Sequence, residues 1–133
     1  CAAPPSDFGE SDVEWMSTED ALPLFENNGA IFIDVREDNE HRGRYIQGAR
    51  RIVAGSLFFG ASIDEKVWGF IETHVANGLL VVVYSETGID NSRCGLVCRA
   101  LAERGLASEK MRRLRGGVIR WAELSYPLRS KPF

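Results

Sequence analysis

The sequence predicts an α/β domain with a mostly parallel sheet that helices cover on both faces. Two runs rich in β-branched residues are typical of strands buried on both sides: the continuous apolar run at 79–84, and residues 30–35, where Asp34 is the one polar residue. Segments with helical spacing of apolar residues lie between and after these runs, and strands that alternate with helices favour parallel pairing. The run at 79–84, the polar loop that follows it and the next helix are the strongest signals in the chain.

Five strands are expected, at residues 13–16, 30–35, 48–53, 79–84 and 110–114. The first is expected to be a short edge strand and the last an outer strand of the sheet. Residues 1–12 are rich in Pro, Ser, Gly and acidic side chains, so we expect a flexible tail before a single domain over residues 13–133.

Helices are expected between these strands. Ser17 is the expected N-cap of a short helix, with Asp20 in the capping-box position and Pro23 limiting the helix length. The remaining helices are expected at residues 36–44, 63–76, 94–105 and 118–124. An apolar bend is expected at residues 57–60.

Composition excludes several classes of function. A net charge of −3 over 133 residues argues against nucleic-acid binding, and no apolar run approaches the ~20 residues of a membrane span. The start of the chain shows no signal-peptide pattern, and three cysteines do not suggest a disulfide framework, so we expect a reducing, intracellular compartment and a monomer. Cys94 and Cys98 are interpreted as packing thiols on one helix face. No spacing implies a metal or an organic cofactor.

The loop at residues 85–93 is the candidate functional site. Ligands of parallel sheets bind outside the carboxyl ends of the strands, and a helix N-terminus favours an anion. Ser85, at the end of the strongest strand, would lie at the rim of such a cradle. An ordinary strand-to-helix connection with a polar surface remains the alternative at this stage.

Three separated stretches carry a resemblance to a known family. They are Asp34-Val35-Arg36-Glu37 with Ile46, Gly48 and Ala49 downstream, the strand that ends at Tyr84, and Leu114-Arg115-Gly116-Gly117 with Trp121 and Pro127 downstream. Over about residues 13–128, their order and spacing resemble those of the rhodanese family, with its D-V-R-E, G-H-I-P-G-A and L-x-G-G motifs. The Gly, His and Pro of the second motif are replaced here. The resemblance implies a three-layer sandwich, in which helices flank a five-stranded, mostly parallel sheet.

The resemblance also implies an active loop of the form C-x-x-G-x-R-S, whose cysteine carries a persulfide and transfers sulfur. Gly88 keeps the offset of the family's glycine, but Ser85 stands where the family has cysteine. A serine hydroxyl cannot form a persulfide, and it is a weak nucleophile without a general base. The resemblance therefore implies a sulfurtransferase that is inactive as written. Whether the serine is natural or has replaced a cysteine stays open.

The loop is longer than the family's sulfurtransferase loop when Arg93 is aligned with the family's loop arginine. A long loop resembles that of the rhodanese-fold phosphatases and arsenate reductases, where a wider cradle suits a tetrahedral oxyanion. In either case the resemblance assigns the nucleophile's position to Ser85, charge neutralisation to Arg93 and anion binding to the loop residues Glu86, Thr87, Gly88, Ile89, Asp90, Asn91 and Ser92. The substrate would be a small molecule that bears sulfur or an oxyanion.

Acidic residues in the loop favour a third interpretation. Glu86 and Asp90 oppose an anion unless they point outward, and Arg93 either compensates for them or pairs with Asp90. A non-catalytic module that binds a protein partner at the loop face would have no such conflict. Scaffold roles are expected for Asp34, as an acceptor for backbone amides, and for Arg36, paired with Glu40.

Overall fold

The computed structural model describes residues 13–36, 43–58, 60, 62–87 and 91–129. Its strands are β1 (Glu14–Met16), β2 (Ala30–Asp34), β3 (Tyr45–Ile46), β4 (Arg50–Arg51), β5 (Leu80–Tyr84), β6 (Met111–Leu114) and β7 (Leu128–Arg129). Its helices are α1 (Thr18–Glu26), α3 (Ala54–Phe58), α4 (Glu65–Ala76), α5 (Asn91–Arg104), the 3-10 helix η1 (Ser108–Lys110) and α6 (Gly117–Glu123). The predicted tail at 1–12 and most of the predicted helix at 36–44 lie outside the described residues.

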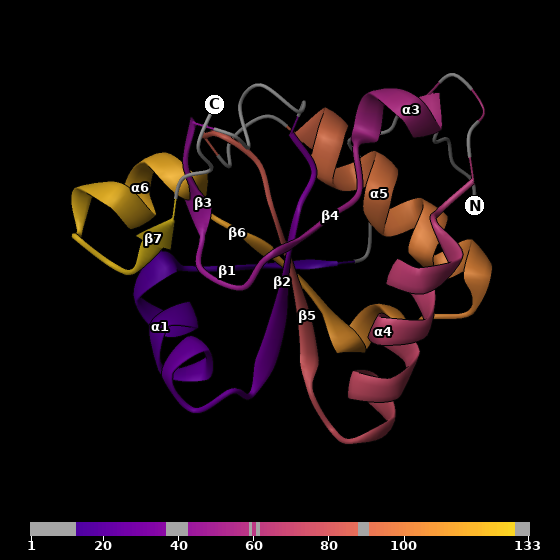
Figure 1. Ribbon diagram of the computed structural model, residues 1–133, viewed down its shortest axis with the longest axis horizontal. Helices are drawn as coiled ribbons and strands as arrows, with labels where there is room; N and C mark the ends of the chain where they lie inside the picture. Colours follow the sequence, from indigo (N-terminus) through magenta and orange to yellow (C-terminus); the bar gives the residue numbers. More distant parts are fainter. Residues whose placement is uncertain (1–12, 37–42, 59, 61, 88–90, 130–133) are drawn as a thin grey trace.

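Five of these strands form one parallel sheet in the order β1-β6-β5-β2-β4. Figure 1 shows this sheet between two layers, with α1 and α6 on one side and α3, α4 and α5 on the other. The predicted α/β three-layer sandwich is therefore confirmed. A small antiparallel sheet of β3 and β7, which the sequence did not predict, lies beside α6.

The two apolar runs form the strands at the centre of the sheet because they can be buried on both faces. Side chains of β2 alternate between two cores: Ile31 and Ile33 pack toward α4 and α5, whereas Phe32 packs with Trp121 of α6. Trp121 is fully buried, and its ring contacts Phe32 with 5.6 Å between centroids.

Local signals define the helix ends. The Ser17 side chain accepts a hydrogen bond from the backbone N–H of Asp20 (3.0 Å), which confirms the predicted N-cap of α1. At α4 the N-cap is Asp64, whose carboxylate accepts from the N–H of Lys66 (2.7 Å). Gly105 has a φ of 116° directly after α5, as expected of a glycine C-cap.

Two expectations were wrong. β6 is not an outer strand but lies between β1 and β5, because its arginines find partners there: Arg113 is buried, donates to the Val13 carbonyl (3.0 Å) and stacks on the Trp15 ring. The expected apolar bend at 57–60 is preceded by a short helix, α3, which reaches Phe58. The five residues of α3 are too few for a periodic pattern, so the sequence did not predict this helix.

Burial of the α5 thiols makes the stability of the fold sensitive to alkaline pH. Cys98 is buried, and burial together with the Cys94 thiol raises its pKa from 9.0 to about 12. The unfolded chain therefore releases this proton at a lower pH than the folded chain does. The stability that the neutral thiol contributes is fully present below pH 9.0 and is lost as the pH rises toward about 12.

We predict that the free energy of unfolding in urea falls between about pH 8 and about pH 10, and that it falls less steeply in Cys98→Ala. The alanine variant is less stable at both values because it leaves a cavity, so the comparison concerns the slope alone. Equal slopes for the two proteins would contradict the assignment of the pH dependence to Cys98.

Candidate functional site

The candidate site lies where the two central strands end. The last residues of β2 and β5, Asp34 and Tyr84, are direct partners in the parallel register, so the segments that follow them leave the sheet side by side. Ser85 follows Tyr84 directly and is 4% exposed. The sheet therefore brings the predicted residues Asp34, Arg36 and Ser85 to one edge, although they are far apart in the sequence.

A buried ion pair fixes the end of β2. The carboxylate of Asp34 accepts from the backbone N–H of Arg36 (2.9 Å), from its Nε (3.0 Å) and from its Nη2 (2.8 Å). Asp34 therefore accepts a backbone amide, as predicted. Both side chains are almost fully buried, at 0% and 1% exposure. Burial alone would lower the pKa of Arg36, but Asp34 and Glu86 raise it above its ordinary value.

Arg36 reaches from β2 to the candidate loop. Its Nη1 donates to the Glu86 carboxylate (2.7 Å), and its Nη2 donates to the Arg44 carbonyl. The sequence had paired Arg36 with Glu40, which lies outside the described residues, and had not connected Arg36 with the loop. Because Asp34 and Glu86 share the one cation of Arg36, the three side chains together carry one net negative charge, and the Glu86 charge is offset only in part.

Tyr84 is the member of this network that sequence reasoning missed. Its hydroxyl donates to Asp34 (3.0 Å) and accepts from the N–H of Ile46 (3.0 Å). Burial, followed by the charge of Asp34, raises the pKa of Tyr84 above its ordinary value, so the phenol stays neutral. The available signal was a tyrosine at the end of an apolar strand that pairs with a strand ending in aspartate.

The N-terminus of α6 holds the backbone of the candidate nucleophile's position. The Val118 N–H donates to the Ser85 carbonyl (3.0 Å), and the Ile119 N–H donates to the Glu86 carbonyl (3.1 Å). Gly117 makes this approach possible, because a Cβ at Gly117 would lie 2.5 Å from the Ser85 carbonyl oxygen. The Gly116-Gly117 pair forms a close backbone turn before α6, and this turn lies against the start of the loop.

The rest of the predicted loop is described only in part. Thr87 is exposed, and Arg93 is half-buried in the first turn of α5. The loop residues 88–90 lie outside the described residues, as do the side chains of Asn91 and Ser92, so their predicted anion binding stays a prediction. The proposed pairing of Arg93 with Asp90 is likewise untested.

Other candidate groups lie away from this edge or inside the core. Cys94 is fully buried among apolar residues, which agrees with its interpretation as a packing thiol. His74 belongs to α4, where its Nδ1 contacts the Phe70 carbonyl (2.8 Å). Within the described residues, no cluster of three His, Cys, Asp or Glu side chains is arranged to hold a metal ion.

Comparison with known proteins identifies the family. The model of the rhodanese-like domain matches residues 17–124, so the chain belongs to the rhodanese-like domain family. No curated protein matches it in sequence. Among the helices of the described part, none is long and apolar enough to cross a membrane.

Solved structures of related folds are similar over most of the chain. A protein of unknown function from Rhodopseudomonas palustris, described as a possible tyrosine phosphatase, is 21% identical (TM-score 0.67), with 92% of this chain and 89% of that chain covered. A yeast protein tyrosine phosphatase of the rhodanese family is 14% identical (TM-score 0.66; 86% and 88% covered). A rhodanese-related protein from Thermoplasma volcanium is 22% identical (TM-score 0.62; 87% and 97% covered). At these identities, the likeness establishes the fold.

Gly117→Ala is expected to destabilise the protein by more than about 2 kcal/mol. A methyl group would collide with the Ser85 and Glu86 carbonyls, and a φ of 57° is strained for alanine. Gly69 is the matched control, because it lies inside α4 with open space at its Cβ, so Gly69→Ala is expected to stabilise by about 0.5–1 kcal/mol. Urea unfolding measures both changes; similar effects at the two sites would contradict the close approach.

Arg36→Lys is expected to lower the free energy of unfolding by about 2–4 kcal/mol, because an ammonium cannot bind Asp34, Glu86 and the Arg44 carbonyl together. Arg120, which pairs with Glu19 on the surface (3.0 Å), provides the control. Arg120→Lys should change stability by less than about 0.5 kcal/mol. An Arg36→Lys protein as stable as the control would show that the network does not support the fold.

Proposed function

We propose that this chain is a rhodanese-like domain of the sulfurtransferase type, in which Ser85 at the nucleophile's position prevents the chemistry. One observation carries the proposal: Ser85 follows the central strand of a rhodanese-like sheet, and α6 fixes its backbone. A side chain at this position is held in one place beside the start of the loop. In this proposal the chain lacks only a nucleophilic sulfur atom at residue 85.

The proposed chemistry requires sulfur rather than oxygen. A cysteine thiolate attacks the outer sulfur of thiosulfate, a new S–S bond forms, and the original S–S bond breaks with its electron pair leaving on sulfite. The resulting persulfide passes its outer sulfur to a thiophilic acceptor. A cysteine with a pKa near ~8.5, lowered further at a helix N-terminus, supplies the thiolate. The Ser85 hydroxyl remains protonated and forms no persulfide.

A cation and a helix N-terminus beside the loop support the binding of an anion at this position. Asp34, Arg36 and Glu86 together carry one net negative charge, because two carboxylates share the Arg36 cation. The half-buried Arg93 then provides a cation in the first turn of α5, where the helix dipole also favours negative charge. In this proposal the loop amides hold the anion, and Arg93 neutralises it.

A second candidate is oxyanion chemistry on a phosphate or arsenate. The observation that favours it is the number of residues between Ser85 and Arg93, which is larger than in the sulfurtransferase loop. Two similar structures are described as a possible tyrosine phosphatase and as a tyrosine phosphatase of the rhodanese family. A non-catalytic module that binds a protein partner through the loop face is the third candidate, because Ser85 would have no catalytic task there.

The test compares the unaltered chain with Ser85→Cys and with Ser85→Ala after treatment with thiosulfate. Intact-mass spectrometry with peptide mapping should find one added sulfur atom on the introduced cysteine and none at residue 85 of the other two proteins. Sulfite release should accompany the added sulfur in the cysteine variant. A sulfur adduct on Cys94 would overturn the choice of site.

A cysteine variant that gains no sulfur would overturn the sulfurtransferase proposal. The same variant is then assayed for release of para-nitrophenol from para-nitrophenyl phosphate, with Ser85→Ala as the blank. Turnover would establish the phosphatase alternative. A variant that is folded by circular dichroism and shows neither reaction would leave the partner-binding module.

A further inference from the structure

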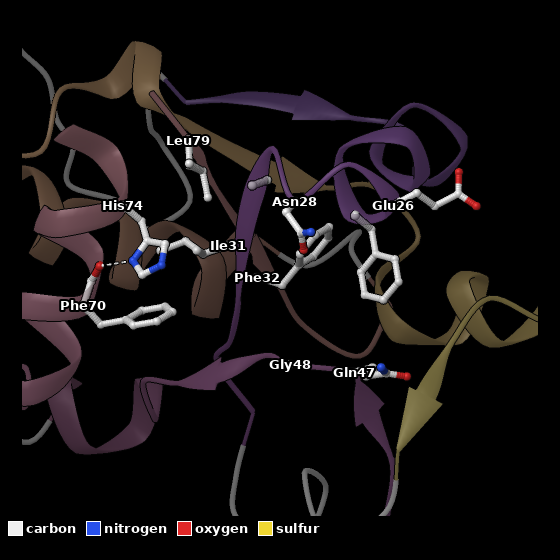
Figure 2. A pocket seen from close by; sticks show the side chains of 11 residues that line it. Glu26, Asn28, Ile31, Phe32, Gln47, Gly48, Phe70, His74 and Leu79 are labelled. Atoms are coloured by element: carbon white, nitrogen blue, oxygen red, sulfur yellow. Dashed lines mark hydrogen bonds between the residues drawn. The ribbon is translucent and has the colours of Figure 1, made fainter. Parts of the chain in front are cut away.

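A groove opens at the opposite end of β2 from Ser85, where the neighbouring strand is short. β4 pairs with β2 only at Ile33 and Asp34, so the edge of Ala30–Phe32 carries no described strand. Figure 2 shows this edge between α4 on one side and α1 on the other, with Gln47 and Gly48 closing the lower end. The groove has a volume of about 680 Å³, which is in the range of small binding sites.

The hydrogen bonds of β2 define which backbone groups face the groove. The Leu80 N–H donates to the Gly29 carbonyl (3.1 Å), and the Val35 N–H donates to the Tyr84 carbonyl (3.1 Å). In a parallel ladder, alternate residues of a strand bond to the same neighbour. The odd-numbered residues of this segment therefore face β5, and the even-numbered residues face the outer edge.

Ala30 and Phe32 consequently present backbone groups to the groove. Asp34 follows the same alternation, since its carbonyl accepts from the Ile52 N–H on the outer side (3.0 Å). Among the described residues, no hydrogen bond is formed by the N–H of Ala30, the carbonyl of Ala30 or the N–H of Phe32. A donor, an acceptor and a second donor, in this order, are what a further strand requires.

Apolar walls flank this edge on both faces of the sheet. Phe25 of α1 packs edge-on against Phe32 (5.9 Å between centroids), whereas Phe70 belongs to α4 and Leu79 follows it. The His74 ring lies against Phe70, with 4.1 Å between centroids. Successive side chains of an added strand point alternately to the two faces, so both walls would receive apolar groups.

The end of the groove near Ala30 is electronegative. α1 and α4 both end there, at Glu26 and Ala76, and each C-terminus carries a partial negative charge. The exposed Glu26 is among the residues that line this end. The Arg50 guanidinium lies over the Phe70 ring (4.3 Å to its centroid) at the other end, where β4 pairs with Ile33. A basic group is therefore the electrostatic complement of this end.

We propose that the groove binds an extended segment of a partner protein, which adds as a strand beside β2. The segment has about three consecutive apolar residues, for the two walls, and a lysine or arginine at the end that lies near Glu26. The site is independent of the chemistry proposed for Ser85, because it lies at the amino end of β2 rather than at its carboxyl end.

The test uses the full chain and the synthetic peptide acetyl-Lys-Val-Ile-Val-Ser-amide. Titration followed by two-dimensional NMR should give saturable shifts that are largest at the amides of Ala30 and Phe32. Those amides should also exchange with solvent faster than the amides of Ile31 and Ile33 before the peptide is added, and more slowly afterwards. Shifts confined to other parts of the molecule, or no saturable binding, would overturn the proposal.

Two further peptides separate strand addition from adsorption of an apolar chain. N-methylation of the first valine removes one backbone donor, and N-methylation of the isoleucine removes the adjacent donor, which faces the other way in a strand. One of the two modifications should abolish binding and the other should be tolerated. Equal effects of both would overturn strand addition.

Charge reversal at the rim tests the predicted polarity without disturbing the core. Glu26→Lys should weaken binding of the lysine peptide roughly three- to tenfold and should strengthen binding of a peptide with glutamate in its place. Glu103→Lys, at an exposed position of α5, is the matched control and should change neither affinity. Identical affinities for Glu26→Lys and the control would overturn the proposed orientation of the basic group.

Discussion

The buried guanidinium of Arg36 is the interaction on which the candidate site depends. It binds Asp34 at the end of β2 and Glu86 at the start of the loop, so a single cation connects two neighbouring strand ends. Removing a guanidinium from water costs more free energy than an ion pair with one carboxylate regains. The several hydrogen bonds of Arg36 must therefore all be present together. The geometry at the carboxyl edge of the sheet is therefore fixed as a unit.

The same unit weakens the repulsion between an acidic loop and a proposed anion site. Glu86 by itself would repel an anion, and Arg36, 2.7 Å from its carboxylate, offsets this in part because it is shared with Asp34. Tyr84 stabilises the ion pair of Asp34 and Arg36, because its neutral hydroxyl donates to Asp34. The backbone is then held from the other side by α6, whose start at Gly117 lies too close to Ser85 and Glu86 for any side chain.

Local patterns in the sequence were sufficient for most elements of the fold. The strands at 30–35 and 79–84 were predicted from apolar runs. The start of α1 was predicted from Ser17, whose side chain caps the helix. The position of β6 could not be obtained in this way. Strand order depends on contacts between distant segments, such as Arg113 with Val13, and the charges of β6 suggested an outer strand.

Three residues that the structure brings to this edge could be chosen from the sequence, but their connections could not. Asp34, Arg36 and Ser85 were chosen from motifs, whereas the partnership of Arg36 with Glu86 requires the parallel register that sets Asp34 beside Tyr84. No spacing within one segment encodes that register. The participation of Tyr84 was missed for the same reason.

The two ends of β2 show how one strand can serve two unlike sites. At its carboxyl end, every described polar group of the Asp34 and Arg36 side chains is engaged inside the protein, which leaves the loop geometry little freedom. At its amino end, β4 stops short, and the backbone groups of Ala30 and Phe32 have no described partner. An edge of this kind recognises a partner through main-chain hydrogen bonds, whose pattern is independent of the side chain at residue 85. A change at Ser85 can therefore alter chemistry while the edge of β2 keeps its capacity to bind a strand.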